Sequence, residues 1–279
     1  MTMDAAALNL TTEVTGYGRF LFLHMDAEKV DSALLQSIES FGSEFENMHF
    51  VDGHPTEDAA RGGRLQYLRA EPGMMADRDL RDEGISHASA MIRLEGRMLE
   101  PLVAYESAMR PVIEERGGQI HVRAGVQKPR SYTSYAMTQF AYARALAPAS
   151  ASQHPFGVVT PQNKTRGWWD MDWMRRESLF LPQYDRDGNM LAKGHALASA
   201  AGIPCINRRL YHHPQGYGLD ARYDFIGYFE FAEADAPVFR AVMEGLRDRT
   251  QNPEWNYVRE GPEWWGRRVA RVEELWPPA

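Results

Sequence analysis

The chain has 279 residues, of which 44% are hydrophobic and 25% are charged, close to the average of soluble globular proteins. This composition excludes a disordered, collagen-like or coiled-coil chain and predicts a packed core. With 31 Lys and Arg against 38 Asp and Glu, the net charge of −7 argues against general binding to nucleic acid, although a local basic pocket for a small anion is compatible with it. The single Cys205 excludes an internal disulfide and a multi-cysteine metal site.

The amino-terminal residues 1–14 contain no basic segment followed by an apolar core, so they do not resemble a signal peptide. No stretch approaches the roughly 18 apolar residues that a membrane-spanning helix needs. We therefore expect a cytoplasmic protein that has no membrane partner.

Strands and helices alternate in the first half of the chain. Apolar residues at helical spacing, such as Leu34 and Ile38, predict the first helix. The predicted elements are a strand over 17–25, a helix over 30–45, a strand over 63–70 within a Gly-rich stretch, a mostly helical segment over 88–115 with Pro101 and Pro111 as breaks or first-turn positions, and a strand over 120–126.

A small-residue-rich segment, Ala141–Pro155, predicts a junction between two domains, one over residues 1–145 and one over residues 150–279. The second half alternates in the same way, and residues 222–231 show the cleanest strand pattern. The predicted elements are strands over 156–160, 207–212 and 222–231, a helix over 236–249 and a closing strand over 255–261.

Each half therefore follows the order of a ferredoxin-like unit, in which helices cover one face of an antiparallel sheet. The predicted fold class is α+β, with two such units in tandem, of the dimeric α+β barrel type. The halves share this order of elements without clear residue-level similarity.

The usual metal and nucleotide motifs are absent. No HExxH, G-x-G-x-x-G or G-x-x-x-x-G-K-[ST] sequence occurs, and His212 and His213 would point to opposite faces of a strand. Seven tryptophans include the pairs Trp168–Trp169 and Trp264–Trp265. Such residues are explained either by core packing or by a pocket for a large flat cofactor.

One arrangement favours the cofactor. His195 precedes Arg208 by thirteen positions. A single histidine can be the lower axial ligand of a haem, and an arginine on the open face would offer a permanent charge and a fork of donors to an oxyanion. Lys164, four residues before Trp168, could meet a haem propionate. By spacing alone, His195 could equally be a structural histidine and Arg208 part of a surface ion pair.

At these residues the chain resembles the chlorite dismutase family of haem proteins. The resemblance is strongest over residues 156–269, in the segments PFGVVTPQNKTRGWWDM, GHALASAAGIPCINRRLYH, YDFIGYFEF and YVREGPEWWGRR. It implies a pair of ferredoxin-like units, one haem b per subunit, and ring-shaped homo-oligomers, with a pentamer favoured. The partner it implies is a small anionic substrate.

The resemblance also implies roles for single residues. His195 matches the proximal ligand of the haem iron, and Arg208 matches the distal arginine of the oxygen-evolving members. Lys164 and Trp168 match residues that border the haem, and Tyr132 matches a tyrosine near the propionates. The glutamate that supports the proximal histidine aligns with either Gln251 or Glu254, and we favour Glu254 because a carboxylate would fix the imidazole tautomer.

The implied function is conversion of chlorite to chloride and dioxygen, with Arg208 as the catalytic residue. About a dozen extra residues around 181–190 depart from the family pattern, which keeps open a peroxidase or a dehydratase of an N-oxygenated organic substrate. Coproheme decarboxylases carry a reactive tyrosine where this chain has Thr160, and lack the arginine matched by Arg208. A haem carrier, a sensor or a haem-free scaffold are the non-catalytic alternatives.

Overall fold

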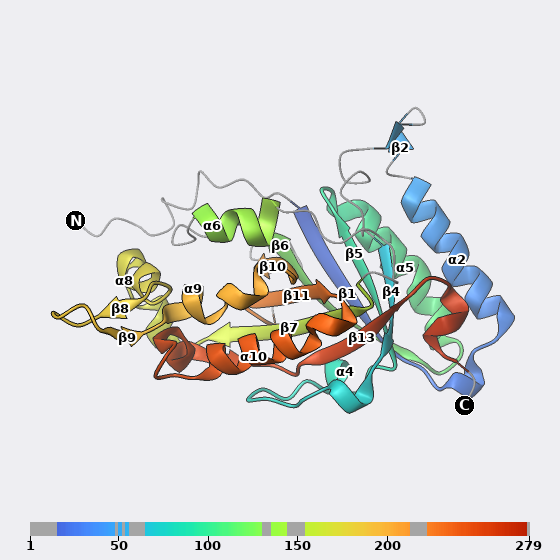
Figure 1. Cartoon of the computed structure of the whole chain (residues 1–279). Helices are drawn as coiled ribbons and strands as arrows, with labels where there is room; N and C mark the ends of the chain where they lie inside the picture. The colour runs from blue at the N-terminus through green and yellow to red at the C-terminus, as the bar shows by residue number, and fades with distance from the viewer. Residues whose placement is uncertain are drawn as a thin grey trace.

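A computed structural model describes residues 16–47, 50–51, 54–55, 65–129, 135–143, 154–212 and 222–277 (Figure 1). Its centre is a sheet of nine strands that runs through both halves of the chain. Of the junction expected at Ala141–Pro155, residues 144–153 lie outside the described ranges.

The first half forms a complete ferredoxin-like unit. Its strands pair antiparallel in the order β6-β1-β5-β4, and two long helices pack on one face. Its elements are β1 (Gly16–His24), α2 (Ser32–Asn47), β4 (Leu65–Ala70), β5 (Ala90–Gly96), α5 (Leu99–Glu114) and β6 (Gln119–Gln127).

The second half repeats this topology, with the strand order β10-β11-β7-β13. The short β12 pairs with the far end of β7, on the edge that β13 also uses. The elements are β7 (Phe156–Lys164), α9 (Gly194–Ala198), β10 (Asn207–His212), β11 (Phe225–Phe231), α10 (Ala236–Arg247), β12 (Val258–Glu260) and β13 (Trp264–Val269). The predicted α+β fold with two tandem ferredoxin-like units is confirmed.

The two sheets close into a barrel, because each edge of one sheet meets an edge of the other. At one seam, β4 and β13 are paired through four residue pairs. At the other seam, β6 and β10 are joined through one described pair, His212 opposite Val126. Large side chains from both units fill the interior, among them Phe20, Phe22, Tyr211 and Trp264.

The barrel interior also holds a hydrogen-bonded polar cluster. Arg93 donates to Gln66 at 2.9 Å and to the Tyr211 hydroxyl at 2.7 Å. The Tyr228 hydroxyl donates to the same Gln66 oxygen at 2.9 Å, and Glu230 accepts from Gln66. Because these residues come from both halves and buried polar groups are costly when unpaired, the cluster ties the two units together.

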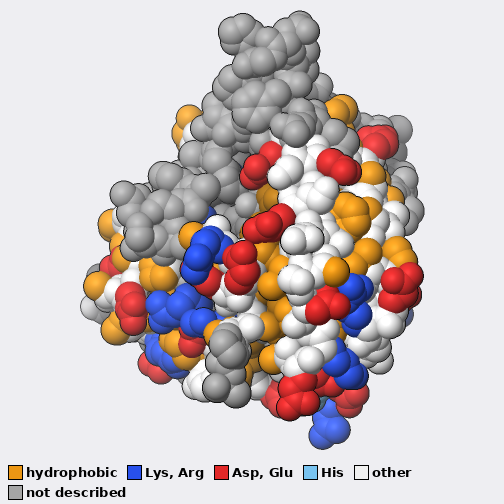
Figure 2. All heavy atoms as spheres, turned by 90° about the vertical axis from the view of Figure 1, so that its right-hand side faces the viewer, with side chains coloured by type: hydrophobic (Ala, Val, Ile, Leu, Met, Phe, Trp, Pro, Cys, Tyr) orange, Lys and Arg blue, Asp and Glu red, His pale blue; other side chains and the backbone are white. Residues whose placement is uncertain are grey.

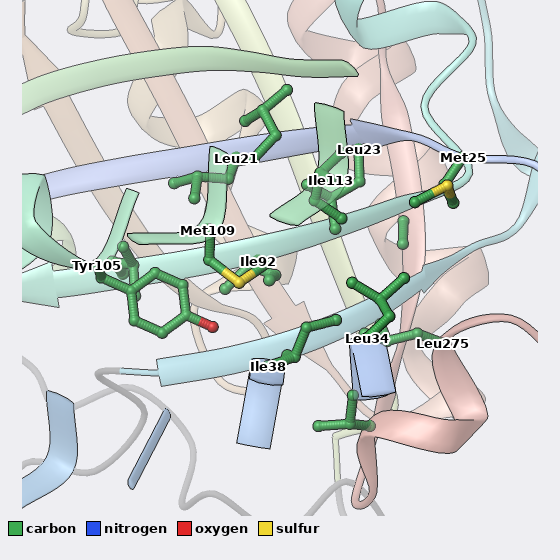
Figure 3. Close-up of a cluster of buried hydrophobic side chains, with 14 of the residues drawn as sticks. Leu21, Leu23, Met25, Leu34, Ile38, Ile92, Tyr105, Met109, Ile113 and Leu275 are labelled. Carbon is green, nitrogen blue, oxygen red and sulfur yellow. The ribbon is translucent and has the colours of Figure 1, made fainter. Parts of the chain in front are cut away.

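The first unit has a filled apolar core between its sheet and its helices (Figure 3). Leu21 and Ile92 point from the sheet toward Ile38 of α2 and Met109 of α5, and all four are fully buried. The carboxy-terminal turn η7 (Val272–Leu275) returns to this core through the buried Leu275.

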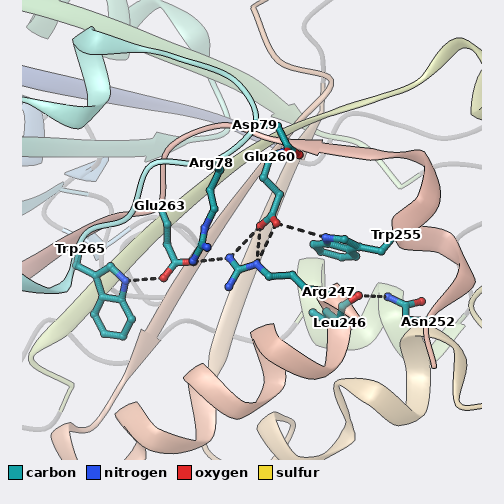
Figure 4. Close-up of polar contacts among 9 residues, drawn as sticks. All are labelled: Arg78, Asp79, Leu246, Arg247, Asn252, Trp255, Glu260, Glu263 and Trp265. Atoms are coloured by element: carbon teal, nitrogen blue, oxygen red, sulfur yellow. Dashed lines mark hydrogen bonds and ion pairs between the residues drawn. The ribbon is translucent and has the colours of Figure 1, made fainter. Parts of the chain in front are cut away.

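A buried ion-pair network fixes α10 to the end of the chain (Figure 4). Arg247 donates to Glu260 at 2.9 Å and also bonds Glu263, whose other oxygen accepts from the Trp265 indole at 2.9 Å. Arg78 of the first unit reaches Glu263 at 3.1 Å. Burial would raise the pKa of Glu263, but the Trp265 and Arg247 hydrogen bonds and the nearby guanidinium charges outweigh it and lower the pKa. The carboxylate is thus held ionised where the two units meet.

The helical prediction for residues 88–115 is wrong in its first part, where β5 lies. Residues of β5 are buried on both faces, toward the barrel interior and toward the helices. A strand covered on both sides lacks the polar alternation that identifies a half-buried strand. Pro111 lies inside α5, which continues past it instead of breaking.

The sequence analysis also missed β13, because Gly266 and the two arginines after it obscure the strand pattern. Trp264 and Trp265 lie on opposite faces of this strand, the first in the barrel interior and the second under α10. Core packing, the simpler of the two explanations for this pair, is therefore the correct one.

Candidate functional site

The site is built around α9, a helix of only five residues. Its first residue, Gly194, has φ +63°, and a Cβ there would collide with the backbone carbonyl of Leu181. The Gly194 amide donates to the Gln251 carbonyl at 2.9 Å, and the Ala196 amide donates to the Phe180 carbonyl at 2.9 Å. Glycine is required at this left-handed, crowded position, and these bonds fix the helix that carries His195.

His195 is oriented by a buried carboxylate. Its Nδ1 atom lies 2.6 Å from Oε2 of Glu254, which sits in the 3-10 helix η6 (Pro253–Tyr257). The other oxygen of Glu254 accepts from Nζ of Lys164, at the end of β7. His195, Glu254 and Lys164 are 6%, 3% and 8% exposed. Nε2 of His195 is buried and has no hydrogen-bond partner among the described residues.

The charges of this triad favour an ionised Glu254. Burial alone would raise the pKa of Glu254, but the Lys164 charge and the bonds from His195 and Lys164 hold it well below its usual range. Burial lowers the pKa of Lys164, and the Glu254 charge opposes that shift. With Glu254 ionised, Nδ1 of His195 is the donor and Nε2 carries the lone pair.

Trp168 closes one side of the triad. It is fully buried at the end of α7 (Arg166–Trp169), and Nζ of Lys164 lies 4.2 Å from the centre of its ring. Phe180 contacts the ring edge-on at 5.8 Å between centroids. The ammonium of Lys164 is therefore held between a carboxylate and an aromatic face, which stabilises its position.

Arg208 approaches the same space from β10. Its Nη1 atom lies 3.4 Å from Sδ of Met137, in helix α6 (Tyr135–Thr138), and its guanidinium lies 5.6 Å from the centre of the Phe229 ring. Its Nε atom is enclosed without a hydrogen-bond partner among the described residues, which also provide no carboxylate within ion-pair distance. Burial lowers the pKa of Arg208, opposed by Tyr142 and Glu254. A guanidinium that lacks a counter-ion binds an anion strongly, because it offers both a positive charge and several N–H donors.

The floor of the space is the sheet of the second unit. Strand pairing sets Gly227 of β11 between Leu210 of β10 and Thr160 of β7. A Cβ on Gly227 would lie 2.8 Å from the Thr160 hydroxyl and 3.0 Å from the Phe229 ring. The floor at Gly227 is therefore backbone against which the Thr160 hydroxyl and the Phe229 ring pack closely.

Two adjoining cavities occupy the space above this floor. His195, Arg208 and Gln162 line both of them. Lys164, Trp168 and Glu254 line the larger, whereas Thr160 and Gly227 line the smaller.

No protein-family model matches the chain, and no curated protein matches its sequence. Solved structures do match. A chlorite dismutase from Candidatus Nitrospira defluvii, in an arginine-to-glutamate variant, is 21% identical, with a TM-score of 0.62 and an alignment that covers 98% of both chains. The chain has the chlorite dismutase fold. The resemblance seen in the sequence is confirmed at the level of the fold.

Two further structures with the chlorite dismutase fold, from the same organism, agree. A complex with imidazole is 20% identical at a TM-score of 0.61, covering 97% of this chain and 98% of that one. A tryptophan-to-phenylalanine variant in complex with cyanide is 19% identical at a TM-score of 0.60, covering 99% of this chain and 98% of that one.

The structure brings five of the six predicted site residues to one space: His195, Arg208, Lys164, Trp168 and Glu254. Tyr132 lies outside the described residues. Between the two aligned alternatives, Glu254 contacts the His195 ring, whereas Gln251 offers only its backbone carbonyl to Gly194.

Sequence reasoning missed the floor residues Gly227 and Gln162. Gly227 interrupts the aromatic strand RYDFIGYFEF and Gln162 lies two residues before Lys164, so alternation along each strand could have placed them on the site's face.

The residues present fit a haem. A buried imidazole nitrogen without a partner, held by a carboxylate on its other nitrogen, is the ligand arrangement that iron requires. None of the helices in the described ranges has the length and apolar character needed to cross a membrane.

Proposed function

We propose that the chain is a haem b enzyme that converts chlorite to chloride and dioxygen. His195 would be the only protein ligand of the iron, and Lys164, Trp168 and Tyr132 would border the cofactor. When bound, the haem would supply an iron atom with a coordination position left open for a small anion. The single observation that carries the proposal is the buried, unpartnered Nε2 of His195, whose ring is oriented by Glu254.

Glu254 would hold the Nδ1 proton of His195 throughout, so that Nε2 stays available to the iron. The charge of Lys164 and the hydrogen bonds from His195 and Lys164 keep the pKa of Glu254 low despite its burial. The carboxylate therefore strengthens donation from the imidazole.

Arg208 would bind the chlorite anion and hold its chlorine atom in place while both Cl–O bonds break and the O–O bond forms, so that only chloride and dioxygen leave the site. The overall change, ClO₂⁻ to Cl⁻ and O₂, consumes no proton, and a permanently charged guanidinium suits it better than a titrating acid. Its lack of a carboxylate partner among the described residues supports this role. Removing one such preorganised donor typically costs about 10²–10³ in rate.

The test is an oxygen-electrode trace after chlorite is added to protein loaded with haemin. We expect oxygen release from the wild type, about 10²–10³-fold less from Arg208→Ala, and only partial recovery in Arg208→Lys, which keeps the charge but loses the fork. His195→Ala should lose the Soret band. A haem-loaded wild type that releases no oxygen would overturn the chlorite activity but not the haem site.

A second candidate is dehydration or peroxidation of an organic N-oxygenated substrate. It is favoured by Leu181, which is 48% exposed and also lines the larger cavity, so that this cavity has an apolar mouth. Aldoxime turnover in place of oxygen release from chlorite would support it. A coproheme decarboxylase is disfavoured because Thr160, which lines the smaller cavity, has no phenol group.

Like the family it resembles, the chain is proposed to act as a homo-oligomer, for which the resemblance favours a pentamer. Mass measurement in solution tests this assignment.

A further inference from the structure

A tyrosine and a histidine are hydrogen-bonded to each other at the edge of the larger cavity. His212 lies on β10, two residues after Leu210 and four after Arg208, and all three side chains line this cavity. The hydroxyl of Tyr142 is hydrogen-bonded to Nε2 of His212. His212 and Tyr142 are 3% and 4% exposed, so the pair is shielded from solvent. Neither the binding of the haem nor that of chlorite uses this pair.

The backbone around Tyr142 keeps the pair in place. Tyr142 belongs to the π-helix η3 (Gln139–Ala143), which follows α6 and packs on β10. Helices of this kind are rare and are often found at functional sites. The Tyr142 carbonyl accepts from Nη1 of Arg209 at 2.8 Å, and its ring lies at 9° to the His212 ring, with 5.7 Å between the centroids. The hydroxyl is therefore held facing the imidazole.

Such a pair can lose an electron without placing a charge on the phenol. An uncharged histidine has one unprotonated ring nitrogen, and with Nε2 in this role the Tyr142 hydroxyl donates to it. When an electron leaves the phenol, its proton passes to Nε2 of His212. The phenol becomes a neutral tyrosyl radical and the imidazole becomes imidazolium. With an ordinary pKa of about 6.5, an imidazole takes up this proton more readily than a carboxylate does.

Two other aromatic side chains near the site are less suited to this step. Nζ of Lys164 lies 4.2 Å from the centre of the Trp168 ring, and a positive charge at this distance opposes the loss of an electron. On the other face of the sheet, the Arg93 guanidinium lies 4.4 Å from the centre of the Tyr228 ring. Electron loss near the cavity is therefore easier at Tyr142.

The pair also lies close to the anion-binding arginine. A phenolate charge on Tyr142 opposes the lowering of the Arg208 pKa, so the two side chains are near each other. The guanidinium itself packs on the Phe229 ring. Because the proton moves to His212, the oxidised phenol stays neutral beside this arginine.

We propose that Tyr142 is a redox-active residue that supplies one electron to the site, with His212 as the acceptor of its proton. The oxidant is a hydroperoxide that is reduced in the cavity, ROOH + 2 e⁻ + 2 H⁺ → ROH + H₂O, with both protons taken from water. Tyr142 supplies one of the two electrons, and the other comes from the iron of the haem. An external phenol or aromatic amine then returns one electron to Tyr142, and the imidazolium returns the proton.

This role in turnover rests on the proposed haem site, whereas the redox behaviour of the pair does not. The first experiment therefore oxidises the full chain without haemin by a laser flash and detects the radical by electron paramagnetic resonance after rapid freezing. We expect a long-lived tyrosyl signal in the wild type and its loss in Tyr142→Phe. The signal should also form more slowly in deuterium oxide than in water, because a proton moves with the electron. His212→Phe and His212→Gln should both lose this difference.

The matched control is Tyr105→Phe. Tyr105 is a buried tyrosine of the first core and contacts Phe45 of α2 edge-on. The outer face at this end of the molecule shows charged side chains spread among apolar ones (Figure 2). The control removes a buried hydroxyl far from the cavity, and it should keep the wild-type signal.

The second experiment adds tert-butyl hydroperoxide to the protein loaded with haemin. We expect the same tyrosyl signal, its loss in Tyr142→Phe and its presence in Tyr105→Phe. A flash signal that persists in Tyr142→Phe, or one that forms equally fast in both solvents, would overturn the redox pair. A flash signal without a hydroperoxide signal would overturn the role in turnover. If no haemin binds, the proposed function fails while the flash measurement still decides the pair.

Discussion

The two ferredoxin-like units follow the same path but differ in their first helix. In the first unit α2 is 16 residues long and its buried Leu34, Ile38 and Phe45 fill the space above the sheet. In the second unit the corresponding α9 has 5 residues, and the space above the sheet is a pair of cavities. A repeated scaffold thus gains a pair of cavities where one helix is shortened.

The two sheets also differ in the size of the side chains that they present to their helices. The first unit presents large aliphatic side chains such as Leu21 and Ile92 to its helices. The second presents Thr160 and Gly227 at the centre of its floor. The helix α10 still covers a normal apolar core beside them, with Phe239 and Trp265. The second unit departs from the filled arrangement under α9 and along the adjoining side of α10, where Leu246 lines the smaller cavity.

The largest effect is expected from Gly227→Phe, which would make the second floor resemble the first. A ring at this position should occupy the space of the cofactor and abolish haem binding. The measurement is a haemin titration followed at the Soret band. Gly73→Phe is the control, because a Cβ there meets nothing within 4 Å and haem binding should persist. Normal binding by Gly227→Phe would show that Gly227 is not part of the floor of the site.

A matched pair of truncations compares the cores directly. Leu102 of α5 is fully buried in the first core, whereas Leu246 of α10 is 6% exposed and lines the smaller cavity. Leu102→Ala should cost about 2–5 kcal/mol in the free energy of unfolding. Leu246→Ala should cost less, because part of its side chain already faces open space. Urea unfolding of both variants measures the difference, and equal costs would contradict a less filled second unit.

The next test weakens the contact that fixes the units to each other. Asp82, directly before α4 (Glu83–Ser86), accepts from Arg123 at 2.8 Å and from the Tyr223 hydroxyl of the second unit at 2.9 Å. Burial would raise the pKa of Asp82, but the Arg123 bonds and charge outweigh it and lower the pKa below 3.8. Asp82→Asn should cost about 3 kcal/mol at neutral pH, as breaking a buried ion pair does.

The pH dependence of that cost follows from the direction of the shift. A lowered pKa in the folded state stabilises the fold above the ordinary value of 3.8 and is lost as the pH falls below it. The stability difference between wild type and Asp82→Asn should therefore be constant near neutral pH and shrink in acid. Chemical unfolding at several pH values measures it, and a difference that grows in acid would contradict the assignment.

The smallest effect is expected from Glu254→Gln. The amide can still accept from Nδ1 of His195 but no longer provides a charge to the imidazole or to Lys164. Loss of such a supporting group typically weakens metal binding by about 10–100-fold. Competition for haemin against a reference protein measures the change. Gln251→Glu is the control, since this residue contacts the site only through its backbone, and it should leave affinity unchanged.

The sequence predicted those helices and strands whose hydrophobic pattern is visible within the segment itself. Alternation in residues 222–231 and the amphipathic stripe of 236–249 gave β11 and α10. Of the closing strand predicted over 255–261, only Val258–Glu260 form a strand, β12, and residues 255–257 belong to η6. β5 was missed because burial on both faces removes the polar alternation, and β13 was missed because Gly266 and the two arginines after it obscure the strand pattern. Their character depends on contacts with distant strands, which a local pattern does not contain.

The site residues divide in the same way, into those that the sequence indicates and those that only the folded chain brings together. His195 and Arg208 were found through chemistry and family resemblance, and Lys164 and Trp168 through their spacing. Two candidates for the partner of His195 remained because Gln251 and Glu254 both lie in an irregular turn. Only the path of the chain after α10 brings Glu254 to 2.6 Å from the imidazole. The floor at Gly227 depends on how β7, β10 and β11 are aligned with one another, and the sequence of a single strand does not contain this alignment.

The two seams of the barrel differ in the number of paired residues, and this difference affects how firmly Arg208 is held. The strand with Arg208 has six pairs on its β11 edge but, within the described residues, one pair on its β6 edge. Backbone amides along that second edge lack the ladder that protects the strands in the middle of the sheet. Deuterium uptake at backbone amides should therefore begin on β10 well before it reaches β1. The guanidinium of Arg208 is thus carried by a strand that opens more readily than those in the middle of the sheet.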